Sequence, residues 1–240
     1  MKPTCAGTDL KTLDRIGFAL AHPVRATIVH ELLSGRFLPS GELAKLAGSA
    51  PSTTSEHLAI LADAGLVRVL IAGRHRYYTL ASDEVAHSLE ALGAIAHVAQ
   101  PRSLTASDRL ARIRGARVCW DHIAGDLGTR LRSALIEGDF VRVQGDDTLV
   151  TPRGTALLHD LGVAGVPPGS VAGGCVDLTE RRLHLRGTFA KGFFRGVSDS
   201  GWIVRGRGRE LCVTPLGLHE FRQRLGMAAE IRPAAGLMRR

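Results

Sequence analysis

The sequence has few cysteines and no apolar segment long enough to cross a membrane. Its four cysteines (Cys5, Cys119, Cys175 and Cys212) lie far apart, and none belongs to a C-x-x-C pair. In a reducing compartment this argues against a disulfide framework and against a structural zinc finger. No apolar run approaches the roughly 20 residues of a membrane helix, and residues 1–10 lack the basic-then-apolar order of a signal peptide. We therefore expect a cytoplasmic protein that has free thiols and no membrane partner.

Motifs typical of enzymes are also missing. The chain has no glycine-rich phosphate loop, no G-x-S-x-G, no H-E-x-x-H and no carboxylate pair at a spacing that indicates acid–base catalysis. The sequence therefore predicts a protein without enzymatic activity.

The chain does carry an excess of positive charge, which suits a polyanionic partner. Lys and Arg number 31 against 23 Asp and Glu, a net charge of +8. Residues 1–100 hold nine of each sign, so the whole excess lies in residues 101–240. The first half still contains one basic cluster without acids, made of Arg68, Arg74, His75 and Arg76.

Helical periodicity dominates the first 63 residues, and an alternating pattern follows it. The predicted helices cover residues 12–20, 23–33, 40–47 and 52–63. In the fourth helix Thr54, Leu58 and Leu61 share one face, so they should pack on the earlier helices. Alternation over residues 67–71, a turn at 72–74 and a return strand at 77–80 predict a basic β-hairpin.

A further helix begins near Ser82 or Asp83 and has a broad apolar stripe. The stripe contains Val85, Leu89, Leu92, Ile95 and Ala96. It is too wide for one small domain to bury, so the sequence predicts dimerisation through this helix.

Ser52, Ser55, His57 and Leu58 form the pattern S-x-x-S-x-H-L, and Ala64-Gly65-Leu66-Val67 follow it directly. With this motif, the region over residues 10–100 resembles the ArsR-type family of small bacterial repressors. The resemblance implies a winged helix-turn-helix, repression of transcription, and a homodimer formed by the first and closing helices.

The residues expected to contact double-stranded DNA lie in two places. The first turns of a helix in the major groove face base edges, whereas wing arginines contact phosphate or the minor groove. The candidates are Ser52, Thr53, Ser55, Glu56 and His57 on the helix and Arg68, Arg74, His75 and Arg76 on the wing. Helix capping by the serines and a local backbone contact by His57 remain alternatives.

The chain departs from the metal-sensing members of the family that it resembles. Pro39-Ser40-Gly41 stand where those sensors carry C-x-C, so that thiolate site is missing. His87 and His97 are ten residues apart and do not share a helix face. The family's usual metal sites are therefore not expected here.

Residues beyond 116 contain a degenerate repeat with an offset of 62 to 63 residues. The matching segments are 122–125 with 184–187, 138–141 with 200–203, and 151–154 with 214–217. Each copy is expected to contain a helix, a hairpin and a second helix that starts with Thr-Pro. Each copy thus looks like a trimmed wing-helix unit.

A candidate effector or thiol site lies at corresponding places in the two copies. Cys119 and His122 are three apart, a spacing that lets them share a ligand on a helix, and Cys175, Asp177 and His184 open the second copy. A metal or metalloid ion, a redox-active thiol and simple burial of the cysteines remain alternatives.

The predicted fold is mostly α with small β-hairpins, in the α+β class: a winged helix-turn-helix followed by two degenerate wing-helix-like units. The predicted divisions are a DNA-binding and dimerisation domain over residues 10–100, a linker over 101–116, units over 117–165 and 166–226, and a fraying tail over 227–240.

The predicted function is a homodimeric, sequence-specific repressor that binds an operator, expected to be an inverted repeat. An effector or thiol chemistry in the C-terminal region is expected to modulate operator binding. The alternative is a constitutive DNA-binding or partner-recruiting protein without a small-molecule effector.

Overall fold

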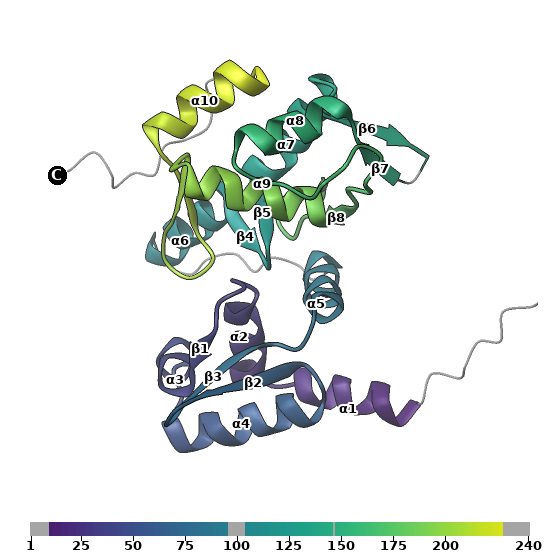
Figure 1. Ribbon diagram of the computed structural model, residues 1–240. Helices are drawn as coiled ribbons and strands as arrows, with labels where there is room; N and C mark the ends of the chain where they lie inside the picture. The colour runs from purple at the N-terminus through teal and green to yellow at the C-terminus, as the bar shows by residue number, and fades with distance from the viewer. Residues whose placement is uncertain (1–9, 96–103, 146, 228–240) are drawn as a thin grey trace, which may run out of the picture. The chain divides into compact units, whose positions relative to one another are not determined.

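A computed structural model describes residues 10–95, 104–145 and 147–227 (Figure 1). The chain divides into two compact units, Met1–Leu89 and Glu90–Arg240. We call them the winged-helix unit and the C-terminal unit, and describe each by itself.

The winged-helix unit contains four helices and a three-stranded antiparallel sheet, and the division between the units falls within α5. Its elements in chain order are α1 (Leu10–Leu20), α2 (Pro23–Leu32), β1 (Leu38–Pro39), α3 (Ser40–Ala47), α4 (Pro51–Asp63), β2 (Val67–Ala72), β3 (His75–Leu80) and the start of α5 (Asp83–Ile95). The strand order is β1-β3-β2, and Val67 pairs with Leu80 at one end of the hairpin and Ala72 with His75 at the other. The winged helix-turn-helix predicted from the sequence is confirmed. Strand β1 was not predicted, because two residues are too short to show a period.

The apolar face predicted for α4 is confirmed, since Thr54, Leu58 and Leu61 are all buried. Helix capping, which the sequence left open as an alternative for the serines of the fourth helix, is not observed. Helix α3 already includes Ser40, and α4 begins at Pro51, with no side-chain cap on either. Proline is suited to the first turn of α4, where its missing N–H has no helical partner to lose.

The described residues of the C-terminal unit contain the end of α5, one further helix, and two copies of a hairpin–helix–hairpin–helix sequence. The further helix is α6 (Leu104–Gly115). The first copy contains β4 (Arg117–Cys119), β5 (His122–Ala124), α7 (Gly125–Glu137), β6 (Val141–Gln144), β7 (Asp147–Val150) and α8 (Pro152–Asp160). The second contains β8 (Gly174–Val176), β9 (Leu183–Leu185), α9 (Thr188–Asp199), β10 (Ile203–Arg205), β11 (Leu211–Val213) and α10 (Pro215–Leu225).

The two copies repeat the same local hydrogen bonds at their second helix. Thr151 accepts a bond from the Gly154 N–H at 3.1 Å, and Thr214 accepts one from the Gly217 N–H at 3.0 Å. These are the N-caps expected from the Thr-Pro pattern, since a threonine oxygen satisfies a free N–H of the first turn.

Four of the five predicted divisions need correction. The predicted linker over 101–116 is mostly the helix α6. The copies over 117–165 and 166–226 are not separate domains, because residues from both form one hydrophobic core. Met227, assigned to the tail, belongs to that core, and residues 228–240 lie outside the described residues.

Gly217 is required by the close approach of α10 to β10. A Cβ atom at this position would overlap the carbonyl oxygen of Trp202. We expect Gly217→Ala to lower the free energy of unfolding by about 1–3 kcal/mol, as overpacking in a tight site does. Urea denaturation checks this. Gly115→Ala is the control, because nothing lies within 4 Å of a Cβ there, and equal stability of the two variants would contradict the prediction.

Candidate functional site

The first turns of α4 present polar side chains to solvent. Ser52, Thr53, Ser55 and Glu56 are exposed, while the opposite face of the helix packs inward. Helix α3 and the turn through Gly48, which has a left-handed φ of 61°, precede α4. The winged-helix unit thus leaves free the end of α4 that would enter a major groove.

His57 was predicted to face DNA, and the structure corrects this. Only 9% of its surface is exposed. Its Nδ1 lies 3.4 Å from Nη1 of Arg25, and its ring centroid lies 4.3 Å from that of His22, with the two rings tilted by 38°. Burial, followed by the charges of His22 and Arg25, lowers the pKa of His57. The histidine therefore holds α4 against α2 rather than contacting a base.

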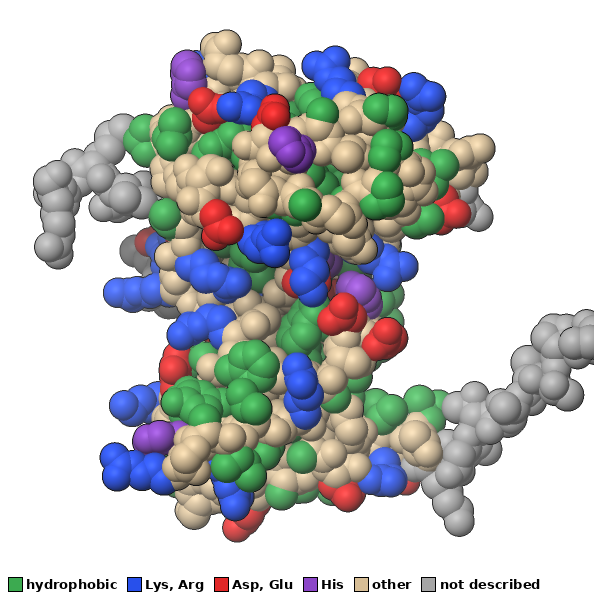
Figure 2. Space-filling view, viewed as in Figure 1, with side chains coloured by type: hydrophobic (Ala, Val, Ile, Leu, Met, Phe, Trp, Pro, Cys, Tyr) green, Lys and Arg blue, Asp and Glu red, His purple; other side chains and the backbone are tan. Residues whose placement is uncertain are grey.

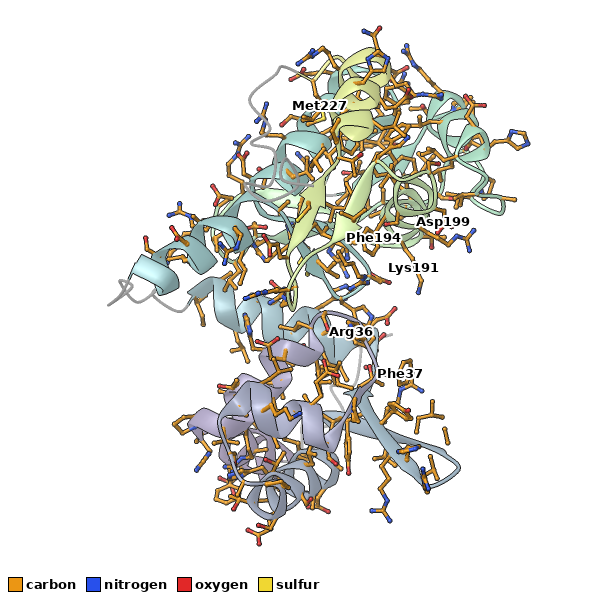
Figure 3. All side chains as sticks on the ribbon, turned by 90° about the vertical axis from the view of Figure 1, so that its left-hand side faces the viewer. Arg36, Phe37, Lys191, Phe194, Asp199 and Met227 are labelled. Atoms are coloured by element: carbon orange, nitrogen blue, oxygen red, sulfur yellow. The ribbon has the colours of Figure 1, made fainter. Side chains whose placement is uncertain are left out.

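The predicted wing residues all lie on the β2–β3 hairpin, and their side chains are exposed. They are Arg68, Arg74, His75 and Arg76. Figure 2 shows Lys, Arg and His side chains gathered where this hairpin ends. The guanidinium of Arg68 lies over the ring of Phe37, 5.7 Å from its centroid, so the loop before β1 helps to orient it. Figure 3 labels Phe37.

A second group of predicted residues comes together in the C-terminal unit. Cys119 pairs with His122 across the β4–β5 hairpin, and Cys175 pairs with His184 across the β8–β9 hairpin. Directly opposed residues of a hairpin point to the same face, so each hairpin offers one sulfur and one imidazole side by side. The four ligand atoms all lie within 4.8 Å of one another, and all four residues are buried. We call these residues the Cys2His2 cluster.

The sequence placed Cys119 and His122 on a helix, and this is wrong, because they lie on opposed strands. The repeat itself held the useful signal. Its offset of 62 residues aligns His122 with His184, whose Nε2 atoms lie 3.1 Å apart. The two cysteines are 56 residues apart and fall outside that alignment, so only the three-dimensional structure brings them together.

A carboxylate lies close to the Nδ1 atom of each histidine in the cluster. Nδ1 of His122 lies 3.0 Å from Oδ1 of Asp121, and Nδ1 of His184 lies 3.3 Å from Oδ2 of Asp177. Each pair orients the ring so that Nε2 points into the cluster. Asp177, predicted as a site residue, thus supports His184 from outside the four ligands. Asp121 was not predicted.

The two thiols of the cluster titrate in opposite directions. The hydrogen bond with Cys119 lowers the pKa of the Cys175 thiol, and His122 and His184 lower it further against the effect of burial. The hydrogen bond with Cys175, together with burial, raises the pKa of the Cys119 thiol. The two thiols therefore do not ionise independently of each other.

Asp177 also belongs to a buried network of charges. Nη2 of Arg117 lies 3.0 Å from Oδ2 of Asp177 and 3.8 Å from Oε2 of Glu90, and Arg209 donates to the other oxygen of Glu90. Burial alone would raise the pKa of Asp177, but His184, Arg117 and backbone N–H groups lower it far more. Two arginines thus balance two carboxylates away from water.

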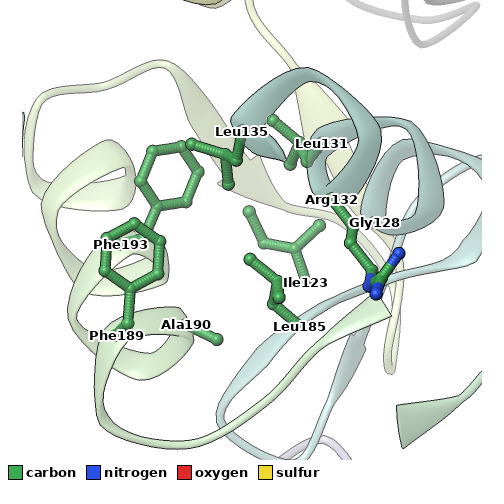
Figure 4. A pocket seen from close by; sticks show the side chains of 9 residues that line it. All are labelled: Ile123, Gly128, Leu131, Arg132, Leu135, Leu185, Phe189, Ala190 and Phe193. Carbon is green, nitrogen blue, oxygen red and sulfur yellow. The ribbon is translucent and has the colours of Figure 1, made fainter. Parts of the chain in front are cut away.

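On the other face of the strands that carry His122 and His184 lies a small apolar pocket (Figure 4). Neighbouring side chains of a strand point to opposite faces, so Ile123 and Leu185 face the pocket while the histidines face the cluster. Arg132 is the charged residue among those that line it. Mostly apolar side chains therefore line the face of these strands opposite the Cys2His2 cluster.

Within residues 10–95, 104–145 and 147–227, no helix has the length and apolar character needed to cross a bilayer.

Comparison with known proteins places the winged-helix unit and the whole chain in one class. Residues 20–69 match the family model of a helix-turn-helix domain. The HTH-type transcriptional regulator CmtR of Mycobacterium tuberculosis is 42% identical over 77 residues, which cover 32% of this chain and 64% of CmtR. A homodimeric winged helix-turn-helix domain from Mycobacterium bovis, described as a possible ArsR-family regulator, is 28% identical, with a TM-score of 0.33 over 37% of this chain and 85% of that one.

The similarity extends through the C-terminal unit in one relative. The uncharacterized HTH-type transcriptional regulator YdfF of Bacillus subtilis is 33% identical over 218 residues, which cover 89% of this chain and 96% of YdfF. This confirms the DNA-binding transcriptional regulator predicted from the sequence. The chain belongs to the family of HTH-type transcriptional regulators.

Proposed function

We propose that this regulator is a homodimeric repressor whose operator binding is modulated through its C-terminal unit. The observation that carries the proposal is the placement of exposed polar residues on α4 beside exposed wing arginines in one small unit. Such a regulator works on cytoplasmic DNA and needs no catalytic step.

Each exposed residue of α4 has a chemical role in reading an operator. The hydroxyls of Ser52, Thr53 and Ser55 donate to or accept from any base edge. Glu56 accepts a hydrogen bond from the amino group of cytosine, so it favours a G·C pair and disfavours close phosphates. This set reads sequence, whereas the wing supplies affinity.

The wing arginines supply a contact that does not depend on base sequence. Arg74 lies in the hairpin turn and Arg76 lies near the start of β3, and both are exposed. Arginine neutralises phosphate and releases condensed counterions, so binding should weaken as salt rises.

The dimer is supported by apolar side chains that remain exposed on α1 and α5. Leu13 is 58% exposed, Phe18 63%, Leu92 49% and Ile95 74%. A second copy covering these residues would remove the apolar surface from water. The mycobacterial winged helix-turn-helix domain similar to this chain is itself described as homodimeric. A two-fold dimer presents two α4 helices to half-sites about 34–36 Å apart, which requires an inverted repeat.

The alternative is a constitutive DNA-binding or partner-recruiting protein. The Cys2His2 cluster favours modulation, because a closed group of two thiols and two imidazoles is able to hold a metal or metalloid ion. Loss of operator binding on adding or removing such an effector separates the two alternatives.

Mobility-shift titration with the DNA upstream of its own gene tests the proposal. We expect sequence-specific binding, and Arg74→Ala plus Arg76→Ala should weaken it at least about tenfold to a hundredfold and reduce the salt slope by up to about four, because the dimer loses two arginines from each chain. Arg15→Ala plus Arg36→Ala is the matched control, since both arginines are exposed in the same unit outside the wing.

Two results would contradict the repressor proposal. One is the absence of specific binding at every salt concentration. The other is equal loss of affinity in the wing and control variants, which would show that net charge alone matters.

A further inference from the structure

The Cys2His2 cluster has the dimensions of a tetrahedral metal site. Zinc–nitrogen and zinc–sulfur bonds of about 2.0 and 2.3 Å place tetrahedral ligand atoms about 3.3 to 3.8 Å apart. The Nε2 atoms of His122 and His184 are 3.1 Å apart, and all four ligand atoms lie within 4.8 Å. Changes of up to about 1 Å in these separations bring the four atoms to tetrahedral distances around one ion.

Charge balance in a buried site points to a divalent ion. All four ligand residues are buried, and a buried unpaired charge is costly. Two thiolates and two neutral imidazoles around one dication sum to zero.

The outer groups are arranged as metal-bound histidines require. Nδ1 of His122 lies 3.0 Å from Asp121 and Nδ1 of His184 lies 3.3 Å from Asp177, the arrangement in which a carboxylate outside the ligands orients a metal-bound histidine. Asp177 is itself fixed by the N–H groups of Gly125 at 2.7 Å and Thr179 at 2.8 Å. The ligands are thus positioned before any ion arrives.

We propose that Cys119, His122, Cys175 and His184 bind one divalent cation of the zinc class in a closed, tetrahedral site. Two sulfur and two nitrogen ligands select zinc and its close analogues over magnesium or calcium, which prefer oxygen. Four protein ligands leave no open position, so the ion braces the structure and catalyses nothing. It ties the first hairpin of one copy to the first hairpin of the other.

A regulatory consequence follows, and it rests on the proposed repressor function. Asp177 supports His184 and pairs with Arg117, and Arg117 pairs in turn with Glu90 of α5. An ion that fixes His184 therefore fixes this buried network on the helix proposed to form the dimer. We expect operator affinity to differ at least about fivefold between the zinc-loaded and metal-free protein.

Metal content of the full-length protein tests the site. We expect about one zinc per chain, lost in Cys119→Ser and in Cys175→Ser. Cys212→Ser is the matched control, because Cys212 is buried in the same unit but lies outside the cluster. Zinc retained in both cluster variants would overturn the proposal.

A second measurement uses the unaltered chain, so its result does not depend on whether the variants fold. Protein stripped by a chelator under reducing conditions is titrated with Co²⁺. The intense visible absorption of thiolate-bound tetrahedral cobalt, displaced by zinc, supports the site. Protection of two of the four cysteines from alkylation by zinc also supports it. Absence of both signals, or a Cys119–Cys175 disulfide whose reduction gives no metal uptake, would overturn it.

Operator affinity, measured with and without zinc, distinguishes the regulatory link from the repressor function. Equal operator affinity with and without zinc would overturn the regulatory link. Lack of specific operator binding by either form would overturn the repressor function, while the zinc stoichiometry would still report on the site.

Discussion

Replacing Arg117 by methionine is expected to lower the free energy of unfolding of the C-terminal unit by about 3–5 kcal/mol. The guanidinium is fully buried and pairs with both Asp177 and Glu90. Its removal leaves two carboxylates, both inaccessible to water, with Arg209 as the remaining guanidinium of the network. The cost comes from this uncompensated charge rather than from the lost side-chain packing.

Urea denaturation, monitored by tryptophan fluorescence, measures the stability of the C-terminal unit. Both tryptophans of the chain, Trp120 and Trp202, lie in the C-terminal unit. Arg112→Met is the control, because Arg112 pairs with Glu210 at 3.3 Å but is 45% exposed. Exposed pairs contribute about 0–1 kcal/mol. If the two variants lose similar stability, the buried network is not what stabilises the unit.

Replacing Leu92 and Ile95 together by aspartate is expected to convert the dimer into a monomer. Both side chains lie on α5, where Leu92 is 49% exposed and Ile95 is 74% exposed. Carboxylates in the proposed interface would be buried beside their copies in the partner, where like charges repel. Because a dimer binds its second half-site intramolecularly, its loss should weaken operator binding about 10²- to 10⁴-fold.

Analytical ultracentrifugation gives the oligomeric state, and mobility shift gives the affinity. Val143→Asp plus Leu216→Asp is the matched control, since these side chains are 47% and 50% exposed in the C-terminal unit. A variant of α5 that stays dimeric would place the interface elsewhere. A wild-type monomer that binds its operator tightly would remove the dimer from the mechanism.

Local periodicity was sufficient to predict most of the winged-helix unit. Thr54, Leu58 and Leu61 recur at helical spacing and are buried, and the β2–β3 register follows from the alternation around Gly73. His57 shows the limit of this argument. From its position along the helix, His57 is compatible with facing either the DNA groove or the protein core. Its contacts with Arg25 and His22, which lie outside α4, place it toward the core.

The C-terminal unit was less predictable because its structure depends on contacts between the copies. The repeat pattern was sufficient to predict the Thr151 and Thr214 caps, whose hydrogen bonds are local. Helix α6 was missed, since Leu110 and Ile113 are only half-buried and its charged residues resemble those of a linker. The Cys2His2 cluster requires β5 to lie beside β9, a long-range contact that no spacing along the chain encodes.

The reciprocal packing of the copies has a consequence for how such a unit arises. Helix α7 of the first copy packs on β9 of the second, and α9 packs on β5 of the first. Each copy by itself offers one sulfur and one imidazole, which is half of a tetrahedral set. An ancestor with a single copy would complete that set only by pairing with a second chain, and duplication within one chain makes the site independent of protein concentration.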